Sequence, residues 1–464
     1  MPAAPALSDA LVMFGASGDL AKKQLFRAVY RLYRRGLLNV PVIGVAIDDW
    51  TDDDLRARAR RSIVEGGESI DQKALDGLLA SMTYLAGDYR DAATFAALAT
   101  RLREAKRPLF HLAIPPPLFA DVAEGLAGAG LNGESRLMVE KPFGHDLESA
   151  QALSRRLLKC FPEERLYRLD HFLGKEPLRN LLVLRFANAM LEPLWSHEHV
   201  SAVKITMAES FDVADRGAFY DATGAVRDVV QNHLLQITSL IAMEEPASED
   251  ADDIRDQKVA AMSAIQPPRP QDVVRGQYKG YRGVDGVAAD SKTETYCALH
   301  LSVDTPRWKG VPFLLRTGKA LAVMSTEITV EFRRPQRPLF LNAECPVNSL
   351  RIPLKPEGPP IMTLIAKEPG EEMTPRTVHY TAEDDGTPAP EPPEAYELLI
   401  EEAMKGDQTL FARQDGVEAT WRAVDPIVEA SGGAVHPYAQ GSWGPTEADA
   451  LAADVGGWPP EPPS

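Results

Sequence analysis

Residues 168–175, R-L-D-H-F-L-G-K, place an acid, an imidazole and an ammonium group close together in the chain. If Asp170 and His171 lie on extended backbone, their side chains point to opposite sides, so one can orient a catalytic partner while the other faces a ligand. Lys175 adds a mobile positive charge of the kind that binds phosphate. The segment therefore predicts a site that holds a phosphorylated small molecule beside a proton-transfer group.

A glycine-containing turn, G-A-S-G-D-L-A-K at 15–22, follows the apolar run 10–14 and precedes a helical pattern over 20–35. Gly15 and Gly18 would let the backbone turn sharply and approach a pyrophosphate, which the N–H groups of the helix start could bind. The spacing departs from G-x-G-x-x-G. A strand-to-helix turn that simply needs glycine is the alternative interpretation.

The end of the next apolar run, 41–47, carries Ile47, Asp48 and Asp49. In dinucleotide-binding folds an acid at this position accepts hydrogen bonds from the ribose of NAD, whereas an arginine accommodates the 2′-phosphate of NADP. Because no arginine follows here before Arg56, the local charge favours NAD. These acids could instead be solvated loop residues or part of a helix cap.

Two further side chains could take part in chemistry. Lys141 follows the predicted strand 136–140, and ligands of open α/β sheets bind beyond the carboxyl ends of strands. A surface lysine at a turn is the alternative. His233 shares a helical apolar stripe with Val229 and Ile237. A histidine in such a stripe is more often a core residue than a catalytic one. As a general base it would need a carboxylate partner, for which Asp170 is a candidate.

The sequence gives little sign of a metal site. His197 and His199 could ligate zinc from a strand, but no further ligands can be identified near them. The three cysteines, Cys160, Cys297 and Cys345, have no C-x-x-C spacing and are odd in number. We therefore expect no metal and no disulfide framework, which fits a reducing, cytoplasmic compartment.

The order of apolar patterns predicts two domains. Strands and helices alternate up to residue 140, which predicts an α/β, doubly wound dinucleotide-binding domain over 8–170. Half-exposed strand patterns then appear at 200–209, 295–304 and 326–334, with helical stretches at 176–190 and 225–244. They predict an α+β domain over 171–455. We expect a proline-rich loop at 384–394, then an amphipathic helix, and a disordered tail at 456–464.

The overall charge excludes some classes of partner. The 464 residues carry a formal net charge of −17. Such an acidic chain is a poor ligand for nucleic acid or an anionic membrane, so an anionic ligand would need a local cluster of cations. The N-terminal residues lack the pattern of a signal peptide, and no window is apolar enough to span a membrane.

Several of these motifs together resemble the glucose-6-phosphate dehydrogenase family. The matching segments occur in the family's order and span nearly the whole chain: GASGDLAKK (15–23), EKPFG (140–144), RLDHFLGK (168–175), LRFAN (184–188), RDVVQNHLLQ (227–236), GVPFLLRTGKAL (310–321) and GSWGP (441–445). The resemblance implies an α/β Rossmann-type domain followed by an α+β domain with a large, mainly antiparallel sheet. It also implies homodimers or homotetramers formed through that sheet.

The resemblance also implies roles for individual residues. His233 would be the catalytic base and Asp170 its carboxylate partner. The substrate-binding residues would be Lys141, His171, Lys175, Glu209, Asp228 and Lys319. The cofactor contacts would be Gly15, Ala16, Ser17, Gly18, Asp19, Leu20, Lys22, Asp48, Asp88, Tyr89 and Lys141.

The implied reaction is oxidation of glucose 6-phosphate at C1 to 6-phosphogluconolactone, with NADP or NAD as hydride acceptor. Three positions depart from the family pattern. Phe172 stands where the family usually has tyrosine, Met324 where it has a basic residue, and Ile47 where it has the arginine that recognises NADP. The first two leave open a related dehydrogenase for another sugar or sugar phosphate, and the third supports NAD or dual use. A non-catalytic sensor of sugar phosphate or nucleotide is a further alternative.

Overall fold

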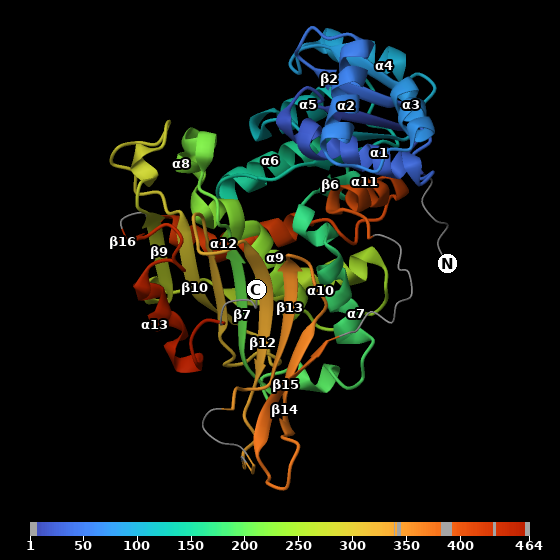
Figure 1. Cartoon of the computed structure of the whole chain (residues 1–464). Helices are drawn as coiled ribbons and strands as arrows, with labels where there is room; N and C mark the ends of the chain where they lie inside the picture. The colour runs from blue at the N-terminus through green and yellow to red at the C-terminus, as the bar shows by residue number, and fades with distance from the viewer. Residues whose placement is uncertain (1–6, 338, 341–344, 382–391, 430–432, 460–464) are drawn as a thin grey trace. The chain divides into compact units, whose positions relative to one another are not determined.

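The computed structural model describes residues 7–337, 339–340, 345–381, 392–429 and 433–459. The described residues divide into two compact units (Figure 1). The first contains the described parts of 1–176, 246–256 and 391–418. The second contains those of 177–245, 257–390 and 419–464. The chain therefore leaves the first unit and returns to it twice.

The first unit is built on a parallel sheet, as the alternating pattern predicts. Its six strands, in order across the sheet, are β3 (Met82–Ala86), β2 (Val42–Ala46), β1 (Ala10–Phe14), β4 (Pro108–Leu112), β5 (Arg136–Val139) and β6 (Leu166–Arg168). Every neighbouring pair in this sheet is parallel. The order reverses at β1, and such a point is where doubly wound folds bind dinucleotides. The expected Rossmann-type fold is confirmed.

Helices connect these strands and start at residues that cap them. Asp71, Asp91 and Asp146 accept hydrogen bonds from the first turns of their helices, and Thr51 forms a capping box with Asp54. The helices of this unit are η1 (Ala21–Leu25), α1 (Phe26–Arg34), α2 (Asp52–Glu65), α3 (Gln72–Ser81), α4 (Ala92–Arg101), η2 (Pro116–Leu118), α5 (Phe119–Gly128), α6 (Leu147–Cys160), η3 (Glu163–Arg165), η4 (His171–Gly174) and α11 (Ala395–Lys405).

Helix α11 belongs to the core of the first unit, although it follows most of the second unit in the chain. Leu399, Ile400 and Met404 are buried in the same cluster as Leu25 and Tyr30. The Arg136 Nη1 donates a 2.6 Å hydrogen bond to the Met404 carbonyl. The amphipathic pattern predicts this helix, but not the sheet that it covers. Of the predicted loop 384–394, residues 384–391 lie outside the described residues.

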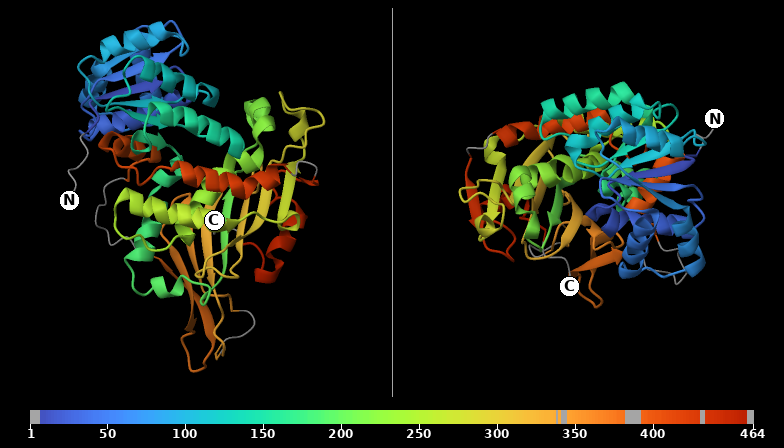
Figure 2. Two further views of the ribbon diagram at one scale, coloured as in Figure 1. Left: turned by 180° about the vertical axis from the view of Figure 1, so that it is seen from behind. Right: turned by 90° about the horizontal axis from the view of Figure 1, so that it is seen from above.

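The second unit contains a mixed, mostly antiparallel sheet, which confirms the expected α+β architecture. Its described strands run in the order β15 (Pro375–Thr381), β14 (Ile361–Lys367), β13 (Ser349–Lys355), β12 (Ser325–Phe332), β7 (Val200–Ala208), β11 (Phe313–Gly318), β10 (Tyr296–Val303), β9 (Val273–Tyr278) and β16 (Val435–Tyr438), with β8 (Ile265–Gln266) paired to β10. The pairs β11–β7 and β16–β9 are parallel. Figure 2 shows the sheet from behind and from above.

The long apolar stretch of the second unit forms two consecutive helices of different type. Residues Val226–Leu234 form a π-helix, η7, and Leu235–Ala242 continue as α9. The predicted helix at 225–244 is therefore present, but its first half is wound more loosely than an α-helix. The remaining helices wholly in this unit are η5 (Glu192–Leu194), η6 (Ala214–Arg216), α8 (Gly217–Ala225), η8 (Pro270–Asp272), η9 (Tyr281–Gly283), η10 (Thr446–Ala448), α13 (Asp449–Ala452) and η11 (Ala453–Val455).

Three helices contain residues of both units: α7 (Glu176–Phe186), α10 (Ala251–Ala264) and α12 (Gln414–Glu429). At the C-terminus, the indole of Trp458 donates a 3.0 Å hydrogen bond to the Ala448 carbonyl, while residues 460–464 lie outside the described residues. Within the part of the chain that the structure describes, we find no helix long and apolar enough to cross a membrane.

Candidate active site

The predicted nucleotide loop leaves β1 at Gly15, in a conformation that needs glycine. Its φ is +81°, and a Cβ there would lie 2.2 Å from the carbonyl oxygen of Ala113. The Gly15 N–H donates to the Val45 carbonyl at 2.8 Å and to the hydroxyl of Tyr89 at 3.1 Å. The loop therefore lies against the carboxyl ends of β1, β2 and β4, the edge at which such folds bind ligands.

Residues 16–22 form the rest of this loop and the start of the helix that follows it. The Gly18 N–H donates to the Gly15 carbonyl at 2.9 Å, which closes the turn before the helix begins. Asp19 is exposed and pairs with Lys23 at 3.0 Å, and this hydrogen bond lowers the pKa of the Asp19 carboxyl. Lys22 lies half-buried beside them. The glycine turn is thus followed by a helix start with a lysine in its first turn, as the sequence predicts.

The acidic residues predicted as cofactor contacts differ in their surroundings. Asp48 is exposed at the end of β2, and its carbonyl accepts a 2.8 Å hydrogen bond from Tyr84. Asp88 is also exposed, but its carboxylate accepts the Arg90 N–H within a local turn at 2.9 Å. Burial raises the pKa of Tyr89 to about 12, so its phenol stays protonated and donates to the Val45 carbonyl at 3.2 Å.

One candidate cofactor residue was not predicted from the sequence. Arg58 on α2 reaches the Ser17 carbonyl with its Nη2 at 3.5 Å. Its Nε is buried and has no hydrogen-bond partner among the described residues. A buried donor in this position, beside the glycine turn, is a candidate to donate a hydrogen bond to a bound ligand. The sequence signal is weak, because Arg58 lies in the middle of a charged helix and its approach to the loop depends on how α2 packs.

Lys141 follows β5 and is adjacent to a buried carboxylate. Glu140 accepts hydrogen bonds from two sides: the His111 imidazole lies 2.9 Å from its Oε1, and the Tyr396 hydroxyl lies 3.3 Å from its Oε2. Burial and the Glu140 charge raise the pKa of the Tyr396 phenol, which therefore acts as a donor. The backbone that carries Lys141 is thus held at the preceding residue.

Asp170 and His171 do not both have the extended backbone that would direct their side chains to opposite sides. Asp170 is extended, but His171 begins the 3₁₀ turn η4, for which Asp170 is the N-cap: its Oδ1 accepts the Phe172 N–H at 3.0 Å. The reason is that a short aspartate competes well for a free N–H two residues ahead. The His171 ring lies 4.9 Å from the ring of Phe172, and the Lys175 Nζ lies 5.7 Å from that ring. Both predicted phosphate ligands therefore flank Phe172.

In the second unit, three of the predicted substrate residues meet. Lys319 follows β11, and its Nζ forms an ion pair with Glu209, the residue after β7. The same Nζ lies 3.9 Å from the Asp228 carboxylate on η7. The rings of Phe211 and Tyr220 lie 4.9 Å and 5.5 Å from this ammonium. In this unit a positively charged side chain therefore lies between two negatively charged ones, beside aromatic side chains.

The predicted base, His233, lies on the same π-helix as Asp228. Its side chain is buried, and its backbone N–H donates to the Asn232 Oδ1 at 2.7 Å. The Asn232 amide in turn donates to the Arg227 carbonyl at 3.0 Å. π-Helical turns inside helices frequently occur at functional sites. The pairing of His233 with Asp170 would join residues of different units, and it stays a prediction.

Comparison with known proteins decides the family. The NAD binding domain of glucose-6-phosphate dehydrogenase matches residues 12–180, and the C-terminal domain of the same family matches 182–459. The chain belongs to the glucose-6-phosphate dehydrogenase family. It is therefore related to oxidoreductases, with a nicotinamide-nucleotide domain at its N-terminus, which confirms the resemblance seen in the motifs.

Individual relatives agree with this assignment over the full chain. The glucose-6-phosphate 1-dehydrogenase 1 of Mycobacterium tuberculosis is 45% identical over 454 residues, which cover 97% of this chain and 96% of the relative. The crystal structure of glucose-6-phosphate 1-dehydrogenase from Mycobacterium avium superposes with a TM-score of 0.91 at 44% identity, covering 99% of this chain and all of the other. A glucose-6-phosphate dehydrogenase solved in complex with glucose 6-phosphate gives 0.92 at 34% identity, with the same coverage.

Relative to the family pattern, Met324 departs by lacking a positive charge, and Arg316 is the cation considered as its replacement. Met324 is half-buried. The Arg316 guanidinium is buried between the rings of Trp443 and Trp458, at 4.4 Å and 4.7 Å, and its Nε donates to Thr206 at 3.0 Å. Arg316 is therefore engaged inside the unit.

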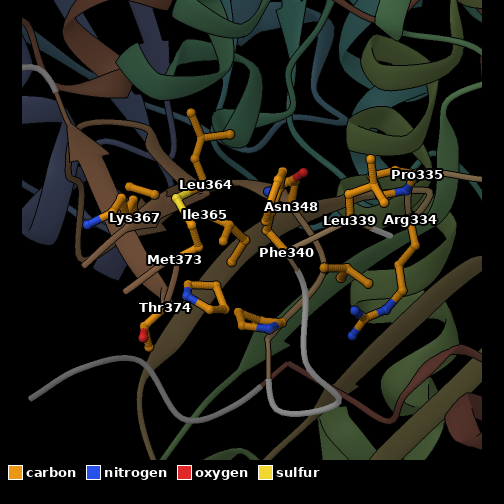
Figure 3. A pocket seen from close by; sticks show the side chains of 14 residues that line it. Arg334, Pro335, Leu339, Phe340, Asn348, Leu364, Ile365, Lys367, Met373 and Thr374 are labelled. Atoms are coloured by element: carbon orange, nitrogen blue, oxygen red, sulfur yellow. The ribbon is translucent and has the colours of Figure 1, made fainter. Parts of the chain in front are cut away.

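A separate cavity of about 400 Å³ in the second unit contains none of the predicted site residues (Figure 3). It is lined by residues of β14 and of the segments around it, including Ile365, Leu339, Phe340 and Met373. The last three are more than half exposed, at 71%, 65% and 57%. Exposed apolar groups that lie together in this way are typical of surfaces that bind another molecule.

Proposed function

We propose that this chain oxidises D-glucose 6-phosphate at C1 to 6-phospho-D-glucono-1,5-lactone, with transfer of a hydride to NAD or NADP, as the first step of the oxidative pentose phosphate pathway. The observation that carries the proposal is the match to both domains of the family, over 12–180 and 182–459. A relative of the same fold, with a TM-score of 0.92, has been solved with glucose 6-phosphate.

In this proposal His233 removes the proton from the C1 hydroxyl. A neutral imidazole is suited to this step near pH 7, because the ideal pKa of a general base lies near the operating pH. Asp170 orients the ring and stabilises the imidazolium, as a buried carboxylate does for the histidine of a serine protease. Loss of this proton strengthens C1 as a hydride donor.

The substrate is held at both of its ends. His171 and Lys175 bind the phosphate, and the buried positions of Phe172 and Leu173 fix the turn between them. Glu209 and Asp228 bind the sugar hydroxyls, and Lys141 and Lys319 face the substrate. Binding energy from the phosphate, remote from C1, is then used to orient the reacting carbon.

The loop at Gly15 fits a nicotinamide dinucleotide, which when bound supplies the hydride acceptor. The fit rests on the close approach at Gly15, where a Cβ would meet Ala113, and on the buried donor of Arg58. The exposed Ile47 and Asp48 favour NAD, whereas Arg58 offers a cation for the 2′-phosphate of NADP. We propose dual use that leans toward NAD.

The replacement His233→Asn tests the reaction and the role of the base together. We expect turnover of glucose 6-phosphate to fall by at least about 100-fold, because general-base catalysis contributes that much or more. Binding of glucose 6-phosphate, measured by calorimetry, should change little. His300→Asn, in the half-buried part of β10, is the matched control. Activity retained in His233→Asn would refute the role of the base.

A second candidate is a dehydrogenase for another sugar or sugar phosphate. It is favoured by Met324, which has no cationic replacement in Arg316, and by the missing hydroxyl at Phe172. Values of kcat/KM for glucose 6-phosphate, free glucose and other hexose phosphates separate the two candidates. If another hexose is preferred over glucose 6-phosphate, that sugar is the substrate and the proposed mechanism still applies to it. Ligand binding by a wild-type protein that turns over none of these sugars would instead favour the sensor.

We further propose a cytoplasmic homodimer or homotetramer. The three cysteines are free and buried, which suits a reducing compartment. The exposed Leu339, Phe340 and Met373 provide an apolar surface for contact between copies. Light scattering of the wild type and of Met373→Glu measures the assembly: we expect a dimer or tetramer that the charge weakens. A monomeric wild type would contradict this proposal.

A further inference from the structure

We propose that Glu294 is a positioning residue of the reaction: its carboxylate anchors the first turn of the π-helix that carries Asp228 and His233. This proposal rests on the proposed function, in which Asp228 binds the substrate and His233 is the base. Glu294 itself lies just before β10 and is separated from that helix by 68 positions in the chain. Its backbone and its side chain both contact the start of the helix.

The contacts are made where the helix cannot satisfy its own donors. A π-helix bonds each N–H to a carbonyl five residues back, so its first N–H groups have no partner inside the helix. The Val226 N–H donates to the Glu294 Oε1 at 3.1 Å, and the Ala225 N–H donates to the Glu294 carbonyl at 3.0 Å. Two successive donors at the start of η7 are therefore bound by one residue.

Gly224, which precedes these two donors, leaves space for the Glu294 carboxylate because it has no side chain. Gly224 has φ 73° and ψ 169°, a combination that is essentially restricted to glycine, and it kinks the chain near the end of α8, just before η7 begins. A Cβ at Gly224 would lie 2.5 Å from the Glu294 Oε1. Gly224 and Glu294 therefore act as a pair: the glycine makes the turn, and the space it leaves is filled by the oxygen that binds the next turn.

The neighbouring residue connects the same point to the substrate lysine. The carbonyl of Thr295 accepts the Lys319 N–H at 2.9 Å. The hydroxyl of Tyr438 donates to the Lys319 carbonyl at 2.7 Å and lies 2.9 Å from the Thr295 hydroxyl. The backbone of Lys319 is thus held on both sides. Residues 294 and 295 together fix the helix of Asp228 and His233 relative to Lys319.

The anchoring depends on an acceptor oxygen more than on a charge. Burial raises the pKa of the Glu294 carboxyl, and the hydrogen bond from Val226 together with the charges of Arg275 and Arg227 opposes this rise. Either protonation state keeps an oxygen that can accept the Val226 N–H. A glutamine, which has an amide oxygen at the same place, should therefore replace Glu294, whereas alanine should not.

The test compares Glu294→Ala with Glu294→Gln by kinetics and by amide hydrogen exchange. We expect Glu294→Ala to lower kcat for glucose 6-phosphate by about 10- to 100-fold, the effect of a small misplacement of catalytic groups. The KM for the nucleotide should stay within about threefold, since Glu294 belongs to the other unit. The amide of 226 should lose protection in Glu294→Ala and keep it in Glu294→Gln, whose kcat should stay within about threefold of wild type. The amide of 225, whose acceptor is the backbone carbonyl of residue 294, should stay protected in both variants.

The outcomes are separable. Glu331→Ala, which removes a glutamate paired with Lys204 in the same sheet, is the control for a general loss of stability. If Glu294→Ala does not fold, Gly224→Ala provides the second variant: its Cβ would meet the Glu294 Oε1 and alanine disfavours this backbone conformation, so both effects should displace the anchor and lower kcat. Unchanged kcat and protection in Glu294→Ala, or a Gln variant as impaired as the Ala variant, would overturn the proposal. A wild type that does not oxidise glucose 6-phosphate would refute the proposed function, while the exchange data would still decide the anchoring.

Discussion

The ammonium of Lys319 lies 3.9 Å from the carboxylate of Asp228 while it pairs with Glu209. One cation therefore separates two carboxylates that come from different elements, η7 and the end of β7. Without it, these half-buried acids would face each other, and like charges repel. In the proposed function, this cation offsets the repulsion between the two carboxylates that bind the hydroxyl groups of the sugar.

Removing this cation should weaken the binding of the sugar. We expect Lys319→Met to raise the KM for glucose 6-phosphate by about 10- to 100-fold, because a charged hydrogen bond is lost and the two acids repel. The KM for the nucleotide should not change. Steady-state kinetics measure both constants, and Lys309→Met, at an exposed position, is the control. An unchanged KM in Lys319→Met would show that the lysine does not contact the substrate.

Restoring a hydroxyl at Phe172 should improve phosphate binding. The ring is buried between His171 and Lys175, the two predicted phosphate ligands. We expect Phe172→Tyr to lower the KM for glucose 6-phosphate about fivefold, as one added hydrogen bond of about 1 kcal/mol would do. The KM for free glucose should stay the same, which separates phosphate binding from a change in the fold. Phe219→Tyr, on an exposed ring, serves as the control. Equal effects on both sugars would contradict the assignment.

The choice of cofactor should respond to one exposed side chain. Ile47 is 70% exposed at the end of β2, where an arginine could reach a 2′-phosphate. We expect Ile47→Arg to raise kcat/KM for NADP about 10-fold and to leave the value for NAD nearly unchanged, because only NADP carries the extra phosphate. Arg58→Ala should lower the value for NADP. Kinetics that do not distinguish the two nucleotides in either variant would remove both residues from cofactor selection.

The stability of the first unit should depend on pH through Glu68. Burial alone would raise the pKa of this carboxyl, but hydrogen bonds from Arg31 and Arg27, each 2.9 Å, bring it below its ordinary value of 4.5. A carboxyl with a lowered pKa in the folded state stabilises the fold above its unfolded pKa, and this contribution is lost as the pH falls.

We therefore expect Glu68→Gln to reduce the free energy of unfolding by about 1 kcal/mol at pH 7, after allowing for the solvent that reaches Arg27. Urea denaturation at pH 7 and below pH 4.5 measures the difference, which should shrink at the lower pH. A difference that is the same at both pH values would contradict the role of the charge.

Much of the fold could be predicted because its signals are local. The apolar runs at 10–14 and 41–47 form β1 and β2 nearly as expected, since short buried strands are continuous in hydrophobicity. The return of α11 to the first unit could not be predicted in this way. Leu399 and Ile400 show one apolar face, but nothing in the neighbouring residues says which of two cores covers it. The periodicity of apolar residues shows which face of a helix is buried, but not which distant part of the chain packs against that face.

The same limit applies to the site. Gly15 could be identified because a turn with positive φ favours glycine whatever surrounds it. The 3₁₀ turn at His171 was missed, because the competition of Asp170 for a backbone N–H depends on local geometry. Arg58 and Glu294 were missed for another reason: each acts on a segment far away in the sequence, at Ser17 and Val226. The π-helical winding of η7 has no distinct apolar pattern of its own.

The last residues of the chain have a consequence for synthesis on the ribosome. The core of the first unit includes Phe411, the backbone of Lys319 is held by Tyr438, and Arg316 is enclosed by Trp443 and Trp458. A nascent chain that has released only the first 390 residues still exposes apolar surface in both units. The domains of larger proteins usually fold one after another, starting from the N-terminus. The first unit of this chain cannot be completed in that way, because part of it follows most of the second unit. The first unit can be completed only after residue 418 has left the ribosome, and the second only after residues from 419 onward have followed, so apolar surface stays exposed until then.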